Sequence, residues 1–237
     1  MKKLVVIPAR YASARLPGKP LRTIAGKPLI QWVYEKAISS SADNILVATD
    51  DERIQETCAS FGAEAVMTDP SLRSGTDRVY EAISGKKGDL IVNLQGDEPF
   101  IEPSMIDTLF RIMEEDVPMA TLCTPISREE YENPNTVKVV LDKSHYALYF
   151  SRSPIPYIRE ALEVPLYGHI GIYGFSRSFL SLFVAMEKGL LEEAESLEQL
   201  RVLENGVRIK VAPVHYTGFG IDTEEDLKKA EERMAKD

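Results

Sequence analysis

The sequence lacks the features of a secreted or membrane-embedded protein. Only two of its 237 residues are cysteines. Cys58 and Cys123 lie far apart, form no CxxC pair and stand in apolar surroundings, so we expect buried, reduced thiols and neither a disulfide nor a zinc site. No apolar run approaches the length of a membrane span, and the four aliphatic residues before Pro8 are too few for a signal peptide. We therefore predict a cytoplasmic protein with no membrane partner.

Acidic residues are absent from residues 1–27, although the chain as a whole is acidic. The chain has a formal net charge of −9, whereas these first residues hold seven Lys or Arg and no Asp or Glu. The rest of the chain therefore carries about −16. A nucleic-acid surface is basic over a broad area, so one short basic segment argues against nucleic acid as a partner. It predicts a local site for a small anion.

The order of the predicted elements indicates an α/β protein. Short aliphatic runs alternate with amphipathic helices in the first half, and continuous rather than alternating aliphatic strands are typical of a parallel sheet covered on both faces. The pattern predicts a single domain, 1–237, with a Rossmann-like, doubly wound, mixed but mostly parallel sheet. From about residue 118 strands dominate, which predicts a mixed or antiparallel extension around 118–175. The expected strands are 4–8, 44–50, 63–67, 89–95, 119–126, 136–142, 146–156, 168–175 and 207–214; the expected helices are 27–40, 51–62, 76–84, 103–115, 176–187, 191–204 and 224–236.

The segment PARYASARLPGKPL, residues 8–21, follows the first strand, where a doubly wound sheet binds its ligand. It matches neither GxxxxGK[ST] nor GxGxxG, so side chains rather than a glycine cradle would supply the binding. Arg10 and Arg15 can each hold phosphate oxygens in a fork, and Lys19 adds a point charge. Together they suit a triphosphate and a departing pyrophosphate; the alternative is three solvated surface cations.

Two aspartates are candidate metal ligands. Asp97 follows the strand at 89–95, and a carboxylate at that edge can hold Mg²⁺ together with substrate oxygens. An Asp in this position is also common in turns and helix caps. Asp222 shares the ambiguity, because Thr223 and Asp226 form the pattern of a capping box that Asp222 could assist. The sequence does not show whether the two aspartates meet.

Several polar residues have a ligand-binding and a structural interpretation. SGTDR (74–78) begins a helix, where it can bind an anion or simply cap the helix. In the strand at 168–175 the period of two puts His169 and Tyr173 on one face, although a lone His is commonly structural. Arg152 suits a carboxylate or a surface ion pair. Glu195 and Gln199, four residues apart on a predicted helix, share a face but are by default solvated.

Eight segments, taken together and in order, resemble the sugar-activating cytidylyltransferases, most closely those that act on 3-deoxy-manno-octulosonate (Kdo). The segments cover essentially the whole chain. They are PARYASARLPGKPL (8–21), SGTDR (74–78), NLQGDEPFI (93–101), NPNTVKVVLD (133–142), YALYFSRSPIP (146–156), HIGIYGF (169–175), LEQLRVLENG (197–206) and GIDTEEDL (220–227).

The resemblance implies a nucleotide-diphospho-sugar transferase fold, a homodimer, and transfer of CMP from CTP to Kdo for lipopolysaccharide synthesis. It makes Asp97 and Asp222 the ligands of Mg²⁺, whose polarisation of the attacking hydroxyl would replace a general base. The catalytic residues implied are Arg10, Arg15, Lys19, Asp97 and Asp222. The implied nucleotide-binding residues are Pro8, Ala9, Arg10, Ser13, Lys19, Ser74, Gly75, Thr76, Arg78 and Gln95. The implied sugar-binding residues are Gln95, Arg152, His169, Tyr173, Glu195 and Gln199.

Three alternatives remain. A cytidylyltransferase for sialic acid or another sugar would share the basic loop and the carboxylates, but it would differ at HIGIYGF and LEQLR. An enzyme for 8-amino-Kdo differs by one hydroxyl-to-amine change that a few side chains can decide. A non-catalytic regulatory module would have lost the metal carboxylates or the lysine, and this chain retains Asp97, Asp222 and Lys19.

Overall fold

The computed structural model describes residues 1–12, 15–160 and 164–235. Its chain divides into two compact units. Unit 1 comprises Met1–Asp107 and Thr217–Asp237, and unit 2 comprises Thr108–Tyr216. The sequence of unit 2 is therefore inserted into that of unit 1.

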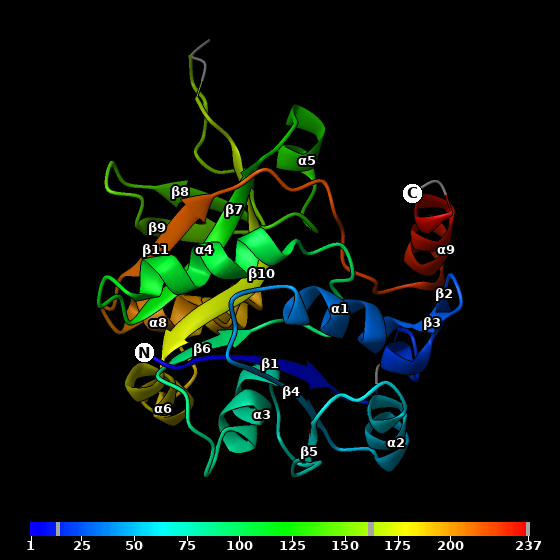
Figure 1. The fold of residues 1–237 in the computed structure, drawn as a ribbon. Helices are drawn as coiled ribbons and strands as arrows, with labels where there is room; N and C mark the ends of the chain where they lie inside the picture. The colour runs from blue at the N-terminus through cyan, green and yellow to red at the C-terminus, as the bar shows by residue number, and fades with distance from the viewer. Residues whose placement is uncertain (13–14, 161–163, 236–237) are drawn as a thin grey trace. The chain divides into compact units, whose positions relative to one another are not determined.

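Unit 1 contains a parallel sheet in the order β6-β1-β4-β5. Figure 1 shows helices α1 and α3 on opposite sides of β1, so the sheet is covered on both faces. This confirms the predicted mostly parallel α/β architecture. The strands are β1 (Lys3–Ala9), β4 (Asn44–Thr49), β5 (Ala65–Met67) and β6 (Leu90–Asn93). The helices are α1 (Leu29–Ile38), α2 (Glu52–Ser60), α3 (Gly75–Ala82) and α9 (Glu224–Met234).

Side-chain caps fix where the helices of unit 1 begin. Ser74 and Asp77 form a capping box that starts α3, and Thr223 and Asp226 form the predicted one that starts α9. Helix α1 begins only after Pro28, two residues later than predicted. The residues before it instead form the small hairpin of β2 (Thr23–Ile24) and β3 (Lys27–Pro28), which follows a 3₁₀ turn, η1 (Lys19–Leu21); the sequence analysis predicted neither.

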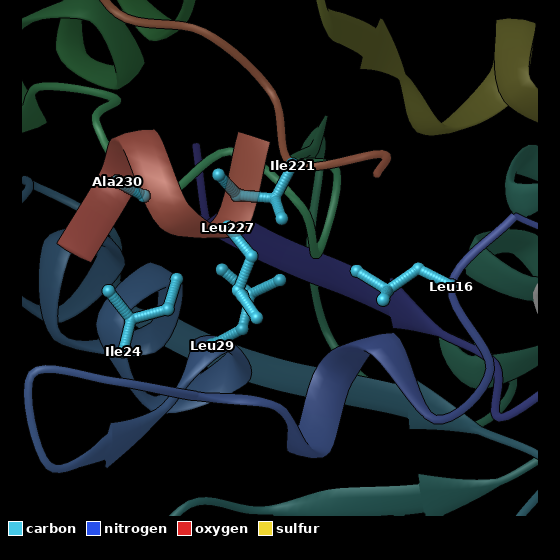
Figure 2. Packing of buried hydrophobic residues seen from close by; sticks show 6 residues of the cluster. All are labelled: Leu16, Ile24, Leu29, Ile221, Leu227 and Ala230. Carbon is cyan, nitrogen blue, oxygen red and sulfur yellow. The ribbon is translucent and has the colours of Figure 1, made fainter. Parts of the chain in front are cut away.

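A core cluster joins the beginning of unit 1 to its C-terminal segment. Figure 2 shows Leu16, Ile24 and Leu29 packed with side chains from the segment around α9, and all are buried. The cluster therefore packs Leu16, which precedes η1, against Ile221, which precedes α9. Its members are Leu16, Ile24, Leu29, Ile221, Leu227 and Ala230.

Unit 2 has the predicted strand-rich, mixed character. β10 pairs antiparallel with β7 and β8, β11 pairs parallel with β7, and β9 pairs antiparallel with β8. The strands are β7 (Met119–Pro125), β8 (Lys138–Leu141), β9 (Ala147–Ser151), β10 (Tyr167–Ser176) and β11 (Ile209–Pro213). The helices are α5 (Arg128–Glu132), α6 (Arg177–Ala185), α7 (Leu190–Glu195) and α8 (Leu200–Glu204), while α4 (Pro103–Met113) crosses the boundary between the units in the sequence.

One predicted helix of unit 2 is wrong. The single helix expected over 191–204 is two short helices, because Ser196 adopts a left-handed conformation with φ of 52°. Glu195 ends α7 and Gln199 is the N-cap of α8, so the two do not share the face of one helix. The apolar spacing of Leu197, Leu200 and Leu203 is helical in period, and it hides this break.

The described part of the chain bears on two expectations from the sequence, one about the cysteines and one about membrane-spanning helices. Cys58 and Cys123 are buried and free, and burial raises the pKa of each thiol to about 12, which keeps both protonated. Among the described residues, no helix combines the length and the apolar character that crossing a membrane requires.

Candidate active site

A cleft of about 550 Å³ in unit 1 collects most of the residues predicted for nucleotide and metal binding. It lies where β1 and β6 end, as expected for a parallel sheet. Arg73 and Gly96 also line it, and the sequence analysis missed both. Ser13 lies outside the described residues. The predicted residues that line the cleft are Pro8, Ala9, Arg10, Arg15, Lys19, Ser74, Gly75, Arg78, Gln95, Asp97 and Asp222.

The two aspartates meet at one ammonium group. Nζ of Lys19 donates to Oδ2 of Asp97 at 2.5 Å and to Oδ1 of Asp222 at 3.0 Å. Arg15 donates from Nη2 to the other oxygen of Asp222, Oδ2, at 2.8 Å. Cations of the 8–21 loop thus contact both carboxylates, which the sequence could not show.

The charges of this cluster act on Lys19. Burial disfavours its charged form, but the attraction and hydrogen bonds of Asp97 and Asp222 outweigh that effect, so the pKa of Lys19 is raised above its ordinary value. The side chain of Lys19 is only 14% exposed. A charged ammonium is therefore held in the wall of the cleft.

Backbone contacts bring the two carboxylates together. The amide of Ile221 donates to the carbonyl oxygen of Asp97 at 2.8 Å, which sets Asp222 beside the end of β6. Asp226 accepts from the amides of Asp222 and Thr223, so the cap of α9 is satisfied without the Asp222 side chain. Asp222 is consequently available to the cleft and does not serve as the cap.

Two glycines shape the loop and the cleft floor. Gly18 has φ of 66°, and its amide donates to the carbonyl of Tyr11 at 3.1 Å, which closes the loop before η1. At Gly96 a Cβ atom would lie 2.8 Å from the carbonyl oxygen of Pro8. Only a residue without a side chain lets the segment after β6 approach the end of β1 so closely.

The SGTDR segment caps α3, which is one of its two predicted roles, and part of it lines the cleft. Ser74 caps α3 and also lines the cleft beside Gly75. Thr76 is buried instead, and its hydroxyl accepts from Nδ2 of Asn93 at 3.2 Å. Asn93 in turn accepts from Nε2 of Gln95 at 2.9 Å, so this chain of hydrogen bonds orients the Gln95 amide in the cleft.

Arg78 lines the cleft but is engaged elsewhere. It is 2% exposed, and it donates from Nη2 to Oδ2 of Asp50 at 2.8 Å and from Nη1 to the hydroxyl of Thr68. A buried, paired guanidinium of this kind supports the wall of the cleft. Sequence reasoning missed Asp50, which directly follows β4 and carried no motif.

In unit 2 the period of two on β10 is confirmed for His169 and Tyr173, whose rings lie 5.3 Å apart. The Thr121 hydroxyl donates to the carbonyl of Ile172 at 2.7 Å and lies 3.0 Å from Nε2 of His169. Since the single hydroxyl proton goes to the carbonyl, we assign the ring proton to Nε2, which makes Nδ1 an acceptor. Burial lowers the pKa of His169 from 6.5 to about 3, so the ring is neutral.

A buried amide lies next to this aromatic pair. The Tyr173 hydroxyl donates to Oε1 of Gln199 at 3.0 Å, and burial raises the pKa of Tyr173, with a smaller contribution from Glu198. Gln199 is 2% exposed, and within the described part of the chain its buried Nε2 has no hydrogen-bond partner. A buried donor without a partner is costly, and a bound polar ligand would satisfy it.

Arg152 and Glu195 form a second polar cluster in unit 2. Glu195 accepts from the Ser151 hydroxyl at 2.6 Å and from the Arg152 amide at 2.9 Å, while Nε of Arg152 donates to the Glu195 carbonyl at 2.9 Å. Lys138, which is 0% exposed, donates to the carbonyls of Asn133, Thr136 and Arg152. Burial lowers the pKa of Lys138, and Glu195 opposes that shift. The sequence signal for this buried lysine was the position of Lys138 within the aliphatic strand VKVVL.

The donor set at Asp97 and Asp222 fits Mg²⁺. This ion prefers one or two carboxylates completed by phosphate oxygens and water, and the two aspartates accept from a common ammonium, so their bonded oxygens are no farther apart than 5.5 Å. Across the described ranges, no group of three or more His, Cys, Asp or Glu side chains is placed to hold a metal. A metal at this cleft would take its remaining ligands from the substrate.

The cleft thus combines loop cations and two carboxylates at the end of parallel strands of an α/β fold. Residues 4–209 match the family model described as cytidylyltransferase, and the chain belongs to that family.

Its relatives include two kinds of enzyme. The chain is 50% identical to a 3-deoxy-manno-octulosonate cytidylyltransferase of Thermodesulfovibrio yellowstonii, with 98% of this chain and 97% of the relative covered. It is 46% identical to an 8-amino-3,8-dideoxy-manno-octulosonate cytidylyltransferase of Shewanella sp. strain ANA-3, with both chains covered completely.

Solved structures agree with the fold. The structure of CMP:2-keto-3-deoxy-manno-octonic acid synthetase complexed with CTP matches with a TM-score of 0.97 and 46% identity, covering 100% of this chain and 99% of that one. A cytidylyltransferase from Leptospira borgpetersenii matches with a TM-score of 0.66 and 16% identity over 100% and 88% of the two chains, which shows the shared fold alone.

Proposed function

We propose that the protein transfers CMP from CTP to the anomeric hydroxyl of Kdo and releases pyrophosphate. The observation that carries this proposal is the cleft of unit 1, where Lys19 and Arg15 meet Asp97 and Asp222 at the end of parallel strands. Relatives named for Kdo and for its 8-amino analogue support the substrate class. The protein would act in the cytoplasm as a homodimer.

The reaction is an in-line displacement at phosphorus. The oxygen of the sugar hydroxyl loses its proton to solvent and forms a bond to the α-phosphorus, the bond from that phosphorus to the bridging oxygen breaks, and pyrophosphate carries away the electron pair. Arg10, Arg15 and Lys19 bind the β- and γ-phosphates and stabilise the charge that develops on the leaving group. The chain's main contribution is to position the reactants and to neutralise charge.

The residues that would hold Mg²⁺ are Asp97 and Asp222. When bound, Mg²⁺ would lower the pKa of the sugar hydroxyl and offset charge on the α-phosphate, in place of a general base. Ser74, Gly75 and Gln95 bind the cytidine part, with Gln95 held by Asn93. Arg78 supports this wall through Asp50.

The sugar is bound by polar groups of unit 2. Nδ1 of His169 accepts a hydrogen bond from a sugar hydroxyl, and Nε2 of Gln199 donates to a sugar oxygen. Arg152 attracts the sugar carboxylate, and Glu195 holds Arg152 in place. The Tyr173 hydroxyl orients the Gln199 amide.

Pyrophosphate release from CTP and Mg²⁺ tests this function directly. Release is measured with Kdo, 8-amino-Kdo, N-acetylneuraminate or no sugar, with and without EDTA. We expect release with Kdo alone, and its loss in EDTA. Release with 8-amino-Kdo in preference to Kdo would reassign the sugar, and release with none of the sugars despite CTP binding would refute the proposed acceptor.

A further inference from the structure

Resting on the proposed function, we propose that Lys19 and the divalent metal compete for the same two carboxylates, so that metal and triphosphate binding are coupled. In this structure Lys19 pairs with both Asp97 and Asp222. When the triphosphate enters, the ammonium moves to phosphate oxygens, and the released carboxylates take the metal.

The geometry leaves little room for both cations. The ammonium of Lys19 is 2.5 Å from Oδ2 of Asp97 and 3.0 Å from Oδ1 of Asp222. The second oxygen of Asp222 is 2.8 Å from Nη2 of Arg15. Both oxygens of Asp222 and one of Asp97 are therefore already occupied by cations. A metal bound to these same oxygens would lie beside the ammonium of Lys19, and the repulsion between the two cations favours displacement of Lys19.

The charges give the direction of the coupling. Lys19 and Arg15 balance the two carboxylates, so the net charge of these four side chains is zero. A divalent ion alone would lie beside two cations, and a triphosphate alone would lie beside two carboxylates; each arrangement places like charges together. With both ligands present, the cations face phosphates and the carboxylates face the metal. Each ligand therefore raises the affinity for the other, and the coupling is reciprocal.

The rival interpretation is that Lys19 is only a phosphate ligand and does not restrict the metal. The two interpretations differ when no nucleotide is present. If Lys19 competes, removing its charge should strengthen metal binding to the free protein. If Lys19 serves only the phosphates, its removal leaves metal binding to the free protein unchanged.

The experiment is a titration of nucleotide-free protein with Mn²⁺, followed by the electron paramagnetic resonance signal of the unbound ion. We expect Lys19→Met to bind Mn²⁺ at least about tenfold more tightly than the wild type, since charge-assisted hydrogen bonds of about 1.5 kcal/mol or more no longer oppose the metal. Arg15→Met should give a smaller gain, because Arg15 contacts only Asp222 and is more exposed than Lys19.

Lys86→Met is the matched control, because it removes one positive charge from unit 1 at an exposed pair with Glu64 and away from the cleft. It should bind Mn²⁺ as the wild type does. Equal affinities in the wild type and Lys19→Met, or an equal gain in Lys86→Met, would overturn the competition. Circular dichroism of each variant establishes that it is folded.

A second measurement uses the reverse coupling and does not depend on Lys19→Met. In EDTA, Asp222→Asn should bind CTP severalfold more tightly than the wild type, because Lys19 and Arg15 are partly released. Unchanged or weaker CTP binding would also refute the coupling. Neither titration uses a sugar, so this inference can fail while Kdo-dependent pyrophosphate release succeeds, and the proposed function can fail while the coupling holds.

Discussion

The amide of Ile221 donates a hydrogen bond to the carbonyl oxygen of Asp97, 2.8 Å away. This backbone contact joins two segments that are far apart in sequence, and each carries one carboxylate of the cleft. Ile221 is also fully buried in the cluster of Figure 2. The positions of Asp97 and Asp222 are therefore set by the main chain and by packing, and charge variants of either side chain should leave the fold intact.

Lys19→Ala should reduce turnover far more than stability. Loss of a cation that stabilises the leaving pyrophosphate is expected to lower kcat by about 10²–10³-fold. The ion pairs that it breaks are partly exposed, so the free energy of unfolding should change by only about 1 kcal/mol. Pyrophosphate release and urea unfolding measure the two effects. A normal kcat would remove Lys19 from the catalytic residues.

Gly96→Ala should damage both stability and nucleotide binding. Its Cβ would lie 2.8 Å from the Pro8 carbonyl, so the segment after β6 must move away from β1, at a cost of about 1–3 kcal/mol. The Michaelis constant for CTP should rise with it. Gly171→Ala is the stability control, because its Cβ would meet no atom within 4 Å. Equal unfolding midpoints for the two variants would contradict the predicted clash.

Arg78→Met should destabilise the protein by about 3–5 kcal/mol, because it leaves the partly buried Asp50 carboxylate without its guanidinium partner. The double variant Asp50→Asn with Arg78→Met should recover part of that loss. Chemical unfolding of the two single variants and the double variant gives the coupling energy. Additive losses would show that the pair does not act as a unit.

Stability should fall as the pH is lowered below 6.5, partly through His169. Its pKa in the folded protein, about 3, lies below the unfolded value of 6.5, so the folded state binds fewer protons between these values. The stability of the folded state with a neutral His169 is fully present above pH 6.5. It decreases as the pH falls from 6.5 toward 3, because the unfolded state then binds a proton that the folded state does not. Between pH 7 and pH 5 we expect His169→Gln to lose less stability than the wild type, by up to about 2 kcal/mol.

The control for this pH dependence is His215→Gln, which replaces an exposed histidine. Urea unfolding of the three proteins at several pH values supplies the measurement. If His169→Gln and the wild type lose the same stability on acidification, the histidine is not held neutral by the fold.

Local pattern predicted the elements well where a run of residues carries its own signal. β1 contains a continuous aliphatic run, and the capping box of Thr223 and Asp226 marks the start of α9. The helix expected over 191–204 failed because a single left-handed residue, Ser196, interrupts an otherwise helical apolar period. One backbone angle leaves no mark in a pattern of hydrophobic residues.

Most of the residues that line the cleft were predictable from the sequence, but the contacts among them were not. Lys19 and Asp97 stood out because charge follows a buried strand. Their meeting with Asp222 depends on the Ile221 amide and on tertiary packing, which no local pattern encodes. The pairing of Arg78 with Asp50 was hidden for the same reason, since Asp50 lies 28 residues earlier.

The division of unit 1 into Met1–Asp107 and Thr217–Asp237 has a consequence for biosynthesis. During translation the basic loop and Asp97 leave the ribosome first, and all of unit 2 is made before Asp222 and the C-terminal members of the core cluster, Ile221, Leu227 and Ala230, exist. Until then Lys19 can pair with Asp97 but not with Asp222, and Leu16, Ile24 and Leu29 lack the other half of their cluster. The cleft can form only after the synthesis of both units.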